Sequence, residues 1–506
     1  MAAFILTQLI GLVRGFIVYR VFGTSADLDS FNAANRVTEV LFNLMAGGAL
    51  GSAFIPTFTG LLAQNRREPA WRLASAIANL LLFFLTLVAL LAMLFAPQIV
   101  RHGLFVLAPG QAAGQEALTI RLLQIMLPSV VIFGLSGLVM GILNAHQKFW
   151  LPAIAPAMYS LGQIAGVWLL PVEMGIDRLA WGALAGAGLH LLVQMPGLLR
   201  LDGRYSATLG LKSSEVREVI RLMGPRILGV AVVQVNFIVN IIIGLSLPTG
   251  SVSALSLAFT WMLMPQAAIA QSVAIAAMPT FSAQAALGKM DEMRSSLASS
   301  LRAVLLLALP AATGLILLRF PLIRLYEGGQ FTSQSTDMVT WALLWYTAGL
   351  IFHSLLELIV RAFYALHDTR TPVTVTVAAM VLNILFSLTL PGWFQKLGWL
   401  PLGGLALANS LATAIECVVL IILLRRRMGG LEGNSIRPAI WQSLLASALM
   451  CLVLFGWLTF TGSLPAWQIL IGGLLAGGLS YAIAILLLRV PEAVHLLKLL
   501  RQRIFR

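Results

Sequence analysis

The chain has 506 residues, of which 59% are hydrophobic and only 10% are charged, and its net charge is +14. A soluble domain usually carries about 25% charged residues, so this composition excludes a soluble enzyme. The basic residues lie in short connections and near the C-terminus, a pattern typical of membrane proteins and not of a nucleic-acid-binding surface. We therefore predict an all-α polytopic membrane protein.

Apolar stretches long enough to cross about 30 Å of hydrocarbon recur along the whole chain. Spans two, seven, eight and ten exceed the minimum length or contain Gly or Pro, which predicts that they are broken or tilted. We predict about fourteen spans, near residues 4–22, 31–62, 73–99, 117–143, 151–171, 179–199, 219–246, 252–283, 297–318, 338–365, 372–391, 401–424, 438–461 and 466–489.

Alternate connections between these spans differ in charge. One set is rich in Lys and Arg, whereas the opposite set has far fewer: Arg101, Arg178, Arg319, Arg324 and Lys396. The positive-inside rule then puts both termini in the cytoplasm, which requires an even number of spans. Ahead of span seven, residues 213–226 have acids and bases on one side and apolar residues on the other, and they are interpreted equally well as an amphipathic cytoplasmic helix or as a solvated linker.

Two sequence echoes indicate an internal duplication. Each echo pairs a segment of the first half with a segment at the corresponding place in the second half. One pair lies near the end of the second span of each half and the other near the end of the fourth, with offsets of about 223 and 220 residues. We predict an N-terminal lobe over 1–212, a C-terminal lobe over 213–430 that includes the amphipathic lead-in, and two extra helices with a basic tail over 431–506. The echoes are Phe54-Ile55-Pro56-Thr57-Phe58 with Ala277-Met278-Pro279-Thr280-Phe281, and Asn144-Ala145 before Pro152 with Tyr364-Ala365 before Pro372.

Charged residues within the first two spans suggest a hydrated cavity. Arg14 and Arg36 lie inside apolar stretches, where a lone cation costs about 2.5–3.5 kcal/mol on insertion scales. A guanidinium presents paired donors that suit a pyrophosphate. Span two carries a polar stripe on one helical face, which Asp29 begins just outside the span; a self-satisfied seam between packed helices is the alternative. The stripe consists of Asn32, Asn35, Arg36, Glu39 and Asn43.

The second half also contains polar residues at membrane depth. Asn240, Asn383 and Thr413 could hold a sodium ion, although hydrogen bonds between helices explain them as well. In span ten, His353, Glu357 and Arg361 share a face and form either a proton relay or a structural ion pair. The sequence has no P-loop, HExxH or GxSxG motif, so we expect a transporter without a catalytic site or an organic cofactor, driven by sodium or by the membrane potential.

The block from Gly11 to Phe58, GLVRGFIVYRVFGTSADLDSFNAANRVTEVLFNLMAGGALGSAFIPTF, resembles the start of the MurJ/MviN proteins, the lipid II flippases. Ala108-Pro109-Gly110, Met223-Gly224-Pro225 and Ala362-Phe363-Tyr364 through Asp368 and Pro372 extend the resemblance over nearly the whole chain. It implies two six-helix lobes and two added helices, and alternating access that carries an undecaprenyl-pyrophosphate-linked cell-wall precursor from the inner to the outer leaflet.

The resemblance also implies headgroup-binding arginines in spans one, two and eight. Arg14, Asp29 and Arg36 match family positions, but Gln8, Phe42 and Thr260 stand where arginines are expected. It implies a monomeric bacterial inner-membrane protein that contacts lipid II and membrane lipids. Two alternatives stay open: an exporter of another polyprenyl-linked saccharide or of a small cationic compound, and a scaffold in cell-wall assembly that transports nothing.

Overall fold

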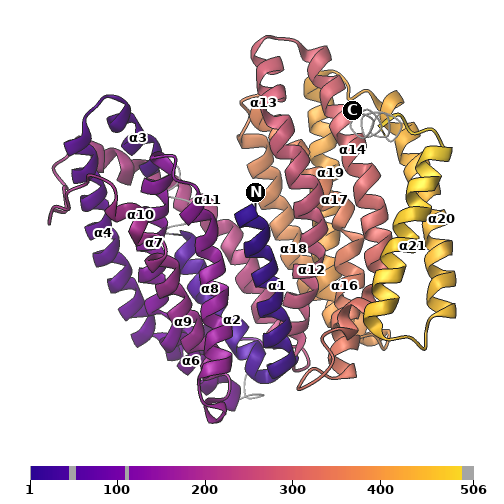
Figure 1. The fold of residues 1–506 in the computed structure, drawn as a ribbon, viewed down its shortest axis with the longest axis horizontal. Helices are drawn as coiled ribbons and strands as arrows, with labels where there is room; N and C mark the ends of the chain where they lie inside the picture. Colours follow the sequence, from indigo (N-terminus) through magenta and orange to yellow (C-terminus); the bar gives the residue numbers. More distant parts are fainter. Residues whose placement is uncertain (1, 45–52, 109–112, 493–506) are drawn as a thin grey trace. The chain divides into compact units, whose positions relative to one another are not determined.

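The computed structural model describes residues 2–44, 53–108 and 113–492, and within these ranges it is built from helices (Figure 1). The predicted all-α membrane fold is confirmed. In this part of the chain, nine helices are long and apolar enough to cross a membrane, and Ser333–Ala348 with Leu350–Ala365 adds a bent tenth. The predicted number of fourteen spans is therefore not confirmed.

The described chain divides into two compact units, the first ending at Ser253 and also including Gly328–Phe331. The predicted lobe boundary falls after residue 212, at the start of α11, which belongs to the first unit here. The helices of the first unit are α1 (Ala2–Phe22), α2 (Ala26–Phe42), α3 (Ile55–Ala63), α4 (Arg67–Leu94), α5 (Ala96–Gln98), η3 (Ile99–Leu104), α6 (Ala113–Met126), α7 (Pro128–Ala145), α8 (Trp150–Leu169), η4 (Val172–Met174), α9 (Asp177–Leu192), α10 (Met195–Leu199) and α11 (Ser214–Leu245).

The second unit comprises Ala254–Glu327 and the described residues from Thr332 onward. Its first helix, α12, begins at Ser251, at the end of the first unit. The helices are α12 (Ser251–Gln266), η5 (Ala267–Gln271), α13 (Ser272–Ala286), α14 (Met290–Leu317), α15 (Arg319–Arg324), α16 (Ser333–Ala348), α17 (Leu350–Ala365), α18 (Arg370–Lys396), α19 (Leu402–Met428), α20 (Gly433–Phe460) and α21 (Ala466–Leu487).

Two of the four spans predicted to be broken or tilted are interrupted within the described residues. Span ten bends by 43° where α16 meets α17 at Gly349, and span eight contains the π-helical turn η5. In span two, α2 ends at Phe42 and α3 begins at Ile55, and residues 45–52 lie outside the described residues. Span seven has no break, because α11 is one uninterrupted helix of 32 residues. That helix begins at Ser214, so the linker alternative for the amphipathic segment is wrong.

The structure supports the internal duplication through helix lengths and helix ends. Helices α4 and α14 both have 28 residues and begin 223 positions apart, at Arg67 and Met290. The connections before them reverse at left-handed residues with the same offset, Asn65 (φ 58°) and Gly288 (φ +69°). The second echo behaves alike, because Gln147 (φ 59°) and His367 (φ 55°), 220 apart, follow the ends of α7 and α17.

Helices α20 and α21 pack on α14, beside which they run in Figure 1. Leu318, Met450, Leu454 and Tyr481 share a buried cluster, and the Tyr481 hydroxyl donates a hydrogen bond of 2.6 Å to the carbonyl of Leu306. Helix α4, the counterpart of α14 in the first unit, has an apolar face that stays exposed.

Four helices of the first unit, α1, α2, α8 and α11, build the site described next. Helix α2 is the least apolar of the four, because it includes Asp27, Asp29, Arg36 and Glu39. Helix α1 is apolar apart from a few residues that include Arg14 and Arg20, and α11 contains the apolar stretch Val233–Leu245.

Candidate functional site: a network joining two arginines

The polar stripe of α2 forms contacts along its own helix. The Arg36 guanidinium pairs with the Glu39 carboxylate, with 2.9 Å between Nη1 and Oε2. The Asn35 amide donates to the other carboxylate oxygen at 2.7 Å. Arg36 also lies over the ring of Phe237 on α11, with Cζ 4.7 Å from the centroid, a cation–π contact that places the guanidinium between two helices.

Helix α8 links this stripe to Arg14 on α1. Nη1 of Arg14 donates to the Gln163 side-chain oxygen at 3.2 Å. The Tyr159 hydroxyl donates to the Asn35 oxygen at 3.2 Å, and Tyr159 lies one turn before Gln163 on α8. We call the set that α8 brings together the arginine network: Arg14, Gln163, Tyr159, Asn35, Glu39 and Arg36.

The sequence analysis missed two members of this network, Tyr159 and Gln163. A signal was present: they are polar residues four apart, on one face of an otherwise apolar predicted span, 151–171. Phe237 was also missed, and no pattern in the sequence singles it out, because a phenylalanine in an apolar helix is ordinary.

Asp29 lies at the start of α2 and has a different set of contacts. Its carboxylate accepts hydrogen bonds from the backbone N–H groups of Gly250 (2.6 Å) and Ser253 (2.7 Å) and from the Ser253 hydroxyl (2.6 Å). Asn32 donates to the same hydroxyl at 3.2 Å. Asp29 is 2% exposed. In this conformation it satisfies backbone donors at the start of α12, as an acid at a helix N-terminus does.

The other predicted cavity residues are not joined to the arginine network by the contacts that the structure gives. Asn43 is the C-cap of α2 and is half-buried. Thr260 lies on α12 in the second unit, is exposed, and donates to the Ser256 carbonyl of its own helix at 2.8 Å. Phe42, where the resemblance implied an arginine, packs its ring against Phe133 with centroids 5.3 Å apart.

The residues predicted for a sodium site fall in both units. Asn240, in the first, donates to the Asn236 carbonyl of its own helix at 3.0 Å. Asn383 and Thr413, in the second, are buried, and Thr413 lies 3.3 Å from Nε2 of His353. The described residues contain no group of three or more His, Cys, Asp or Glu side chains suited to a metal ion. The sodium site stays a prediction.

In span ten, His353 and Glu357 have different partners. His353 contacts Asn409 (3.0 Å) as well as Thr413, whereas Glu357 pairs with Arg361 at 3.4 Å and accepts from Gln266 at 3.4 Å. The Glu357–Arg361 contact is the structural ion pair that was one of the two alternatives. Among the contacts given, no bond joins His353 to Glu357, as a proton relay would need.

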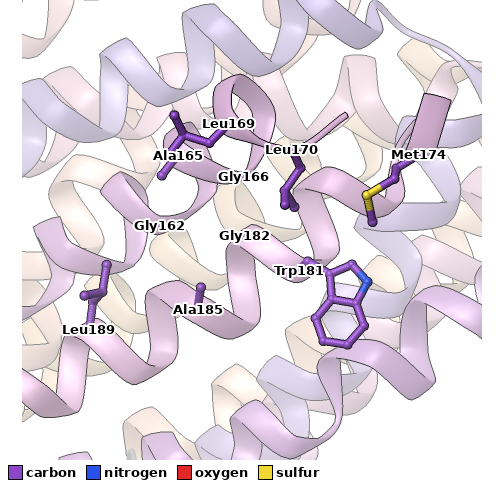
Figure 2. Close-up of a pocket in the computed structure, with 10 residues that line it drawn as sticks. All are labelled: Gly162, Ala165, Gly166, Leu169, Leu170, Met174, Trp181, Gly182, Ala185 and Leu189. Atoms are coloured by element: carbon purple, nitrogen blue, oxygen red, sulfur yellow. The ribbon is translucent and has the colours of Figure 1, made fainter. Parts of the chain in front are cut away.

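A cavity of about 400 Å³ lies between α8 and α9, and Figure 2 shows its lining. It is bordered by backbone and apolar side chains, from Leu189 at one end to Met174 and Trp181 at the other. Its walls include no charged residue, so it is no site for an anionic headgroup. It exists where small residues, Gly162 and Gly182 among them, bring the two helices close.

The arginine network can bind an anion. It contains two cations and one acid, so its net charge is positive. Each guanidinium has five N–H donors, and the contacts given above use one nitrogen of Arg14 and one of Arg36. Both side chains are only partly buried, with 29% of the Arg36 side chain exposed. A phosphate-bearing ligand would find paired donors there in a region of low dielectric constant.

In fold, the chain resembles a class of solved proteins, membrane transporters that include members of the MOP superfamily. A solved multidrug resistance MATE family transporter of that superfamily is similar with a TM-score of 0.71 and 15% identity, covering 85% of this chain and 96% of that one. A solved lipid II flippase MurJ in an inward closed conformation gives a TM-score of 0.79 and 24% identity, covering 96% and 98%.

Within that class, the family model described as lipid II flippase MurJ matches residues 18–470, and the chain belongs to the MurJ family. The lipid II flippase MurJ of Burkholderia cenocepacia is 28% identical over 435 residues, 84% of this chain and 82% of that protein. The probable lipid II flippase MurJ of Vibrio cholerae is 28% identical over 502 residues, covering 96% and 94%. This chain is thus a multi-pass inner-membrane protein of a transporter family.

Proposed function

We propose that the protein is a flippase that moves lipid II from the inner to the outer leaflet of the cytoplasmic membrane by alternating access. Membership of the MurJ family supports this, together with relatives that carry the flippase name over most of their length. The observation that carries the proposal is the arginine network, which offers two guanidiniums on neighbouring helices of a membrane protein.

Lipid II is an undecaprenyl-pyrophosphate-linked precursor, and its headgroup is anionic. Arg14 and Arg36 would bind the pyrophosphate, and the amides and hydroxyl of the arginine network would hold them in place. A guanidinium donates two hydrogen bonds at once to phosphate oxygens, so it binds a phosphate more specifically than a single point charge does. The family arginines missing at Gln8, Phe42 and Thr260 leave these two residues with a larger share of the binding.

The driving force and the topology belong to the same proposal. A cation that crosses the membrane potential experiences about 2.3 kcal/mol per 100 mV. The potential can therefore bias the return of an empty cavity that contains positive charge, and sodium at Asn240, Asn383 and Thr413 is the alternative source of energy. We propose that the protein acts as a monomer with both termini in the cytoplasm, as the distribution of Lys and Arg favours.

Depletion of the resident flippase from a bacterium, with expression of this chain, tests the proposal. We expect the wild-type chain to restore growth and the appearance of lipid II in the outer leaflet. Arg14→Gln and Arg36→Gln should each abolish rescue at normal membrane expression. Arg72→Gln is the matched control, because Arg72 is exposed and pairs only with Glu68 in the same helix turn among the contacts given. Failure of the wild-type chain to rescue would refute lipid II as cargo.

Export of a small cationic compound is the second candidate, since Glu39 is an acid with 43% of its side chain exposed. That candidate predicts that Glu39 is indispensable and that Arg36 is not. Transport of a fluorescent organic cation is measured in membrane vesicles that contain a variant of Glu39 or of Arg36. Loss of transport in the Glu39 variant but not in the Arg36 variant indicates a cationic cargo.

A further inference from the structure

We propose that Gln163 and Tyr159 on α8 are positioning residues: Gln163 holds Arg14, and Tyr159 holds Arg36 through Asn35 and Glu39, in the geometry that binds the pyrophosphate. This inference rests on the proposed function and goes beyond it, because neither residue belongs to the polar stripe or to a cationic position. Both act on the ligand through other side chains.

The hydrogen bonds of the two α8 residues have fixed directions. Arg14 can only donate, so Gln163 accepts through its oxygen at 3.2 Å. Tyr159 gives its single hydroxyl proton to the Asn35 oxygen at 3.2 Å. Asn35 then donates to Glu39 at 2.7 Å, and Glu39 pairs with Arg36. One turn of α8 thus orients Arg14 through Gln163, and Asn35 and Glu39 through Tyr159.

The alternative is that Gln163 merely joins α8 to its neighbours, and the packing argues against it. Helices α8 and α9 are already held by direct backbone approach: a Cβ on Gly166 would lie 2.4 Å from the Arg178 carbonyl, and one on Gly162 would lie 2.2 Å from Gly186. Gln163 lies on α8 beside these glycines, is 3% exposed, and directs its oxygen to a guanidinium on α1. A buried amide at membrane depth is costly unless its bonds are satisfied.

The consequence is that both arginines depend on one turn of α8. A phosphate that binds Arg36 competes with Glu39 for its donors, and Glu39 also accepts the hydrogen bond from Asn35. Loss of Gln163 should therefore loosen Arg14, and loss of the Tyr159 hydroxyl should loosen Arg36 through Asn35 and Glu39, even though no charge changes. Positioning of this kind affects affinity more than stability, because the guanidinium persists but loses its fixed orientation.

The test uses the full-length protein in nanodiscs, with lipid II binding measured by titration and translocation measured at saturating lipid II. We expect Gln163→Leu to weaken binding at least about tenfold, the usual effect of losing a hydrogen bond to a charged group. Tyr159→Phe, which keeps the ring against Phe133 (centroids 5.2 Å apart), should weaken it about threefold. Matched controls are Gln442→Leu and Tyr481→Phe, which lose hydrogen bonds to backbone carbonyls in the second unit; both should bind as the wild type does.

A double-mutant cycle provides the readout that a merely structural role would not change. In an Arg14→Gln background, Gln163→Leu should add no further loss of affinity, because its only route to the ligand is gone. Full additivity, or wild-type affinity in both single variants, would overturn the inference. If Gln163→Leu does not fold, Tyr159→Phe and its cycle with Arg36→Gln decide the question in the same way, because Tyr159 acts through Asn35 and Glu39 on Arg36. Lack of binding by the wild-type protein would instead defeat the proposed function.

Discussion

Replacing Glu39 by glutamine removes the acid of the arginine network and keeps its shape. If the ligand is a pyrophosphate, the carboxylate competes with it for Arg36. The pair is partly solvated, with 29% and 43% of the two side chains exposed, so its strength is that of a surface ion pair, about 0.2–1 kcal/mol. At 1.4 kcal/mol per tenfold, Glu39→Gln should bind lipid II about 1.4 to 5 times more tightly.

A cationic cargo predicts the opposite sign. Glu39 would then contact the ligand, and losing a charge-assisted hydrogen bond costs about 1.5–3 kcal/mol, which is tenfold or more in affinity. The sign of the change thus reports the charge of the cargo, even though the favourable effect is small.

The assay is equilibrium binding of lipid II to the full-length protein in nanodiscs, at low ionic strength and at 150 mM salt. Asp27→Asn is the matched control, an exposed acid in the first turn of the same helix, and should leave the affinity unchanged. The gain from Glu39→Gln should shrink at the higher salt concentration as the pair becomes screened. Binding weakened more than tenfold by Glu39→Gln, in a protein with wild-type thermal stability, would refute the reasoning.

Three further predictions concern stability, measured as thermal unfolding in detergent. Asp29→Asn should cost about 1–3 kcal/mol, because an amide cannot accept all the hydrogen bonds at Gly250 and Ser253; an unchanged melting temperature would contradict the capping role. Gly166→Ala should destabilise the first unit, since its Cβ would lie 2.4 Å from a backbone oxygen, whereas Gly188→Ala, with open space around it, should not. Asp368→Ala should cost about 1 kcal/mol by loss of its bonds to Thr371 at the start of α18. These bonds lower the pKa of the Asp368 carboxyl, so its contribution is present at neutral pH and is lost as the pH falls below the ordinary value of about 4; the variant should be insensitive to that change.

The sequence predicts the helices well where apolar length decides. Spans such as 372–391 and 466–489 correspond to α18 and α21, because a long apolar run has few alternatives to a membrane helix. Breaks were harder to predict. Length and glycine content selected span seven along with span ten, but only the second bends, since a bend depends on packing at Gly349 as well as on composition.

The candidate site was predicted in part, and the division has a physical cause. Charged residues in apolar helices are conspicuous, so Arg14, Arg36 and Glu39 stood out from the sequence alone. Their partners did not, because which helix lies against α1 and α2 is a property of tertiary packing. Asp29 was predicted to bind cargo from its place in the stripe; its contacts with backbone donors 221 or more residues away in the chain are visible only in the structure.

Helices α20 and α21 cover α14, whereas the corresponding apolar face of α4 is exposed, so the bilayer acts on the two halves in different ways. Phe83 on α4 is 67% exposed, whereas Leu306, its counterpart 223 positions later on α14, is 6% exposed. Acyl chains would touch one half of the duplicated fold directly and reach the corresponding face of the other only through the added pair of helices. A change in bilayer thickness or acyl-chain order would therefore affect the two halves to different extents. Lipid composition would then shift the preference of the protein for one conformation over another.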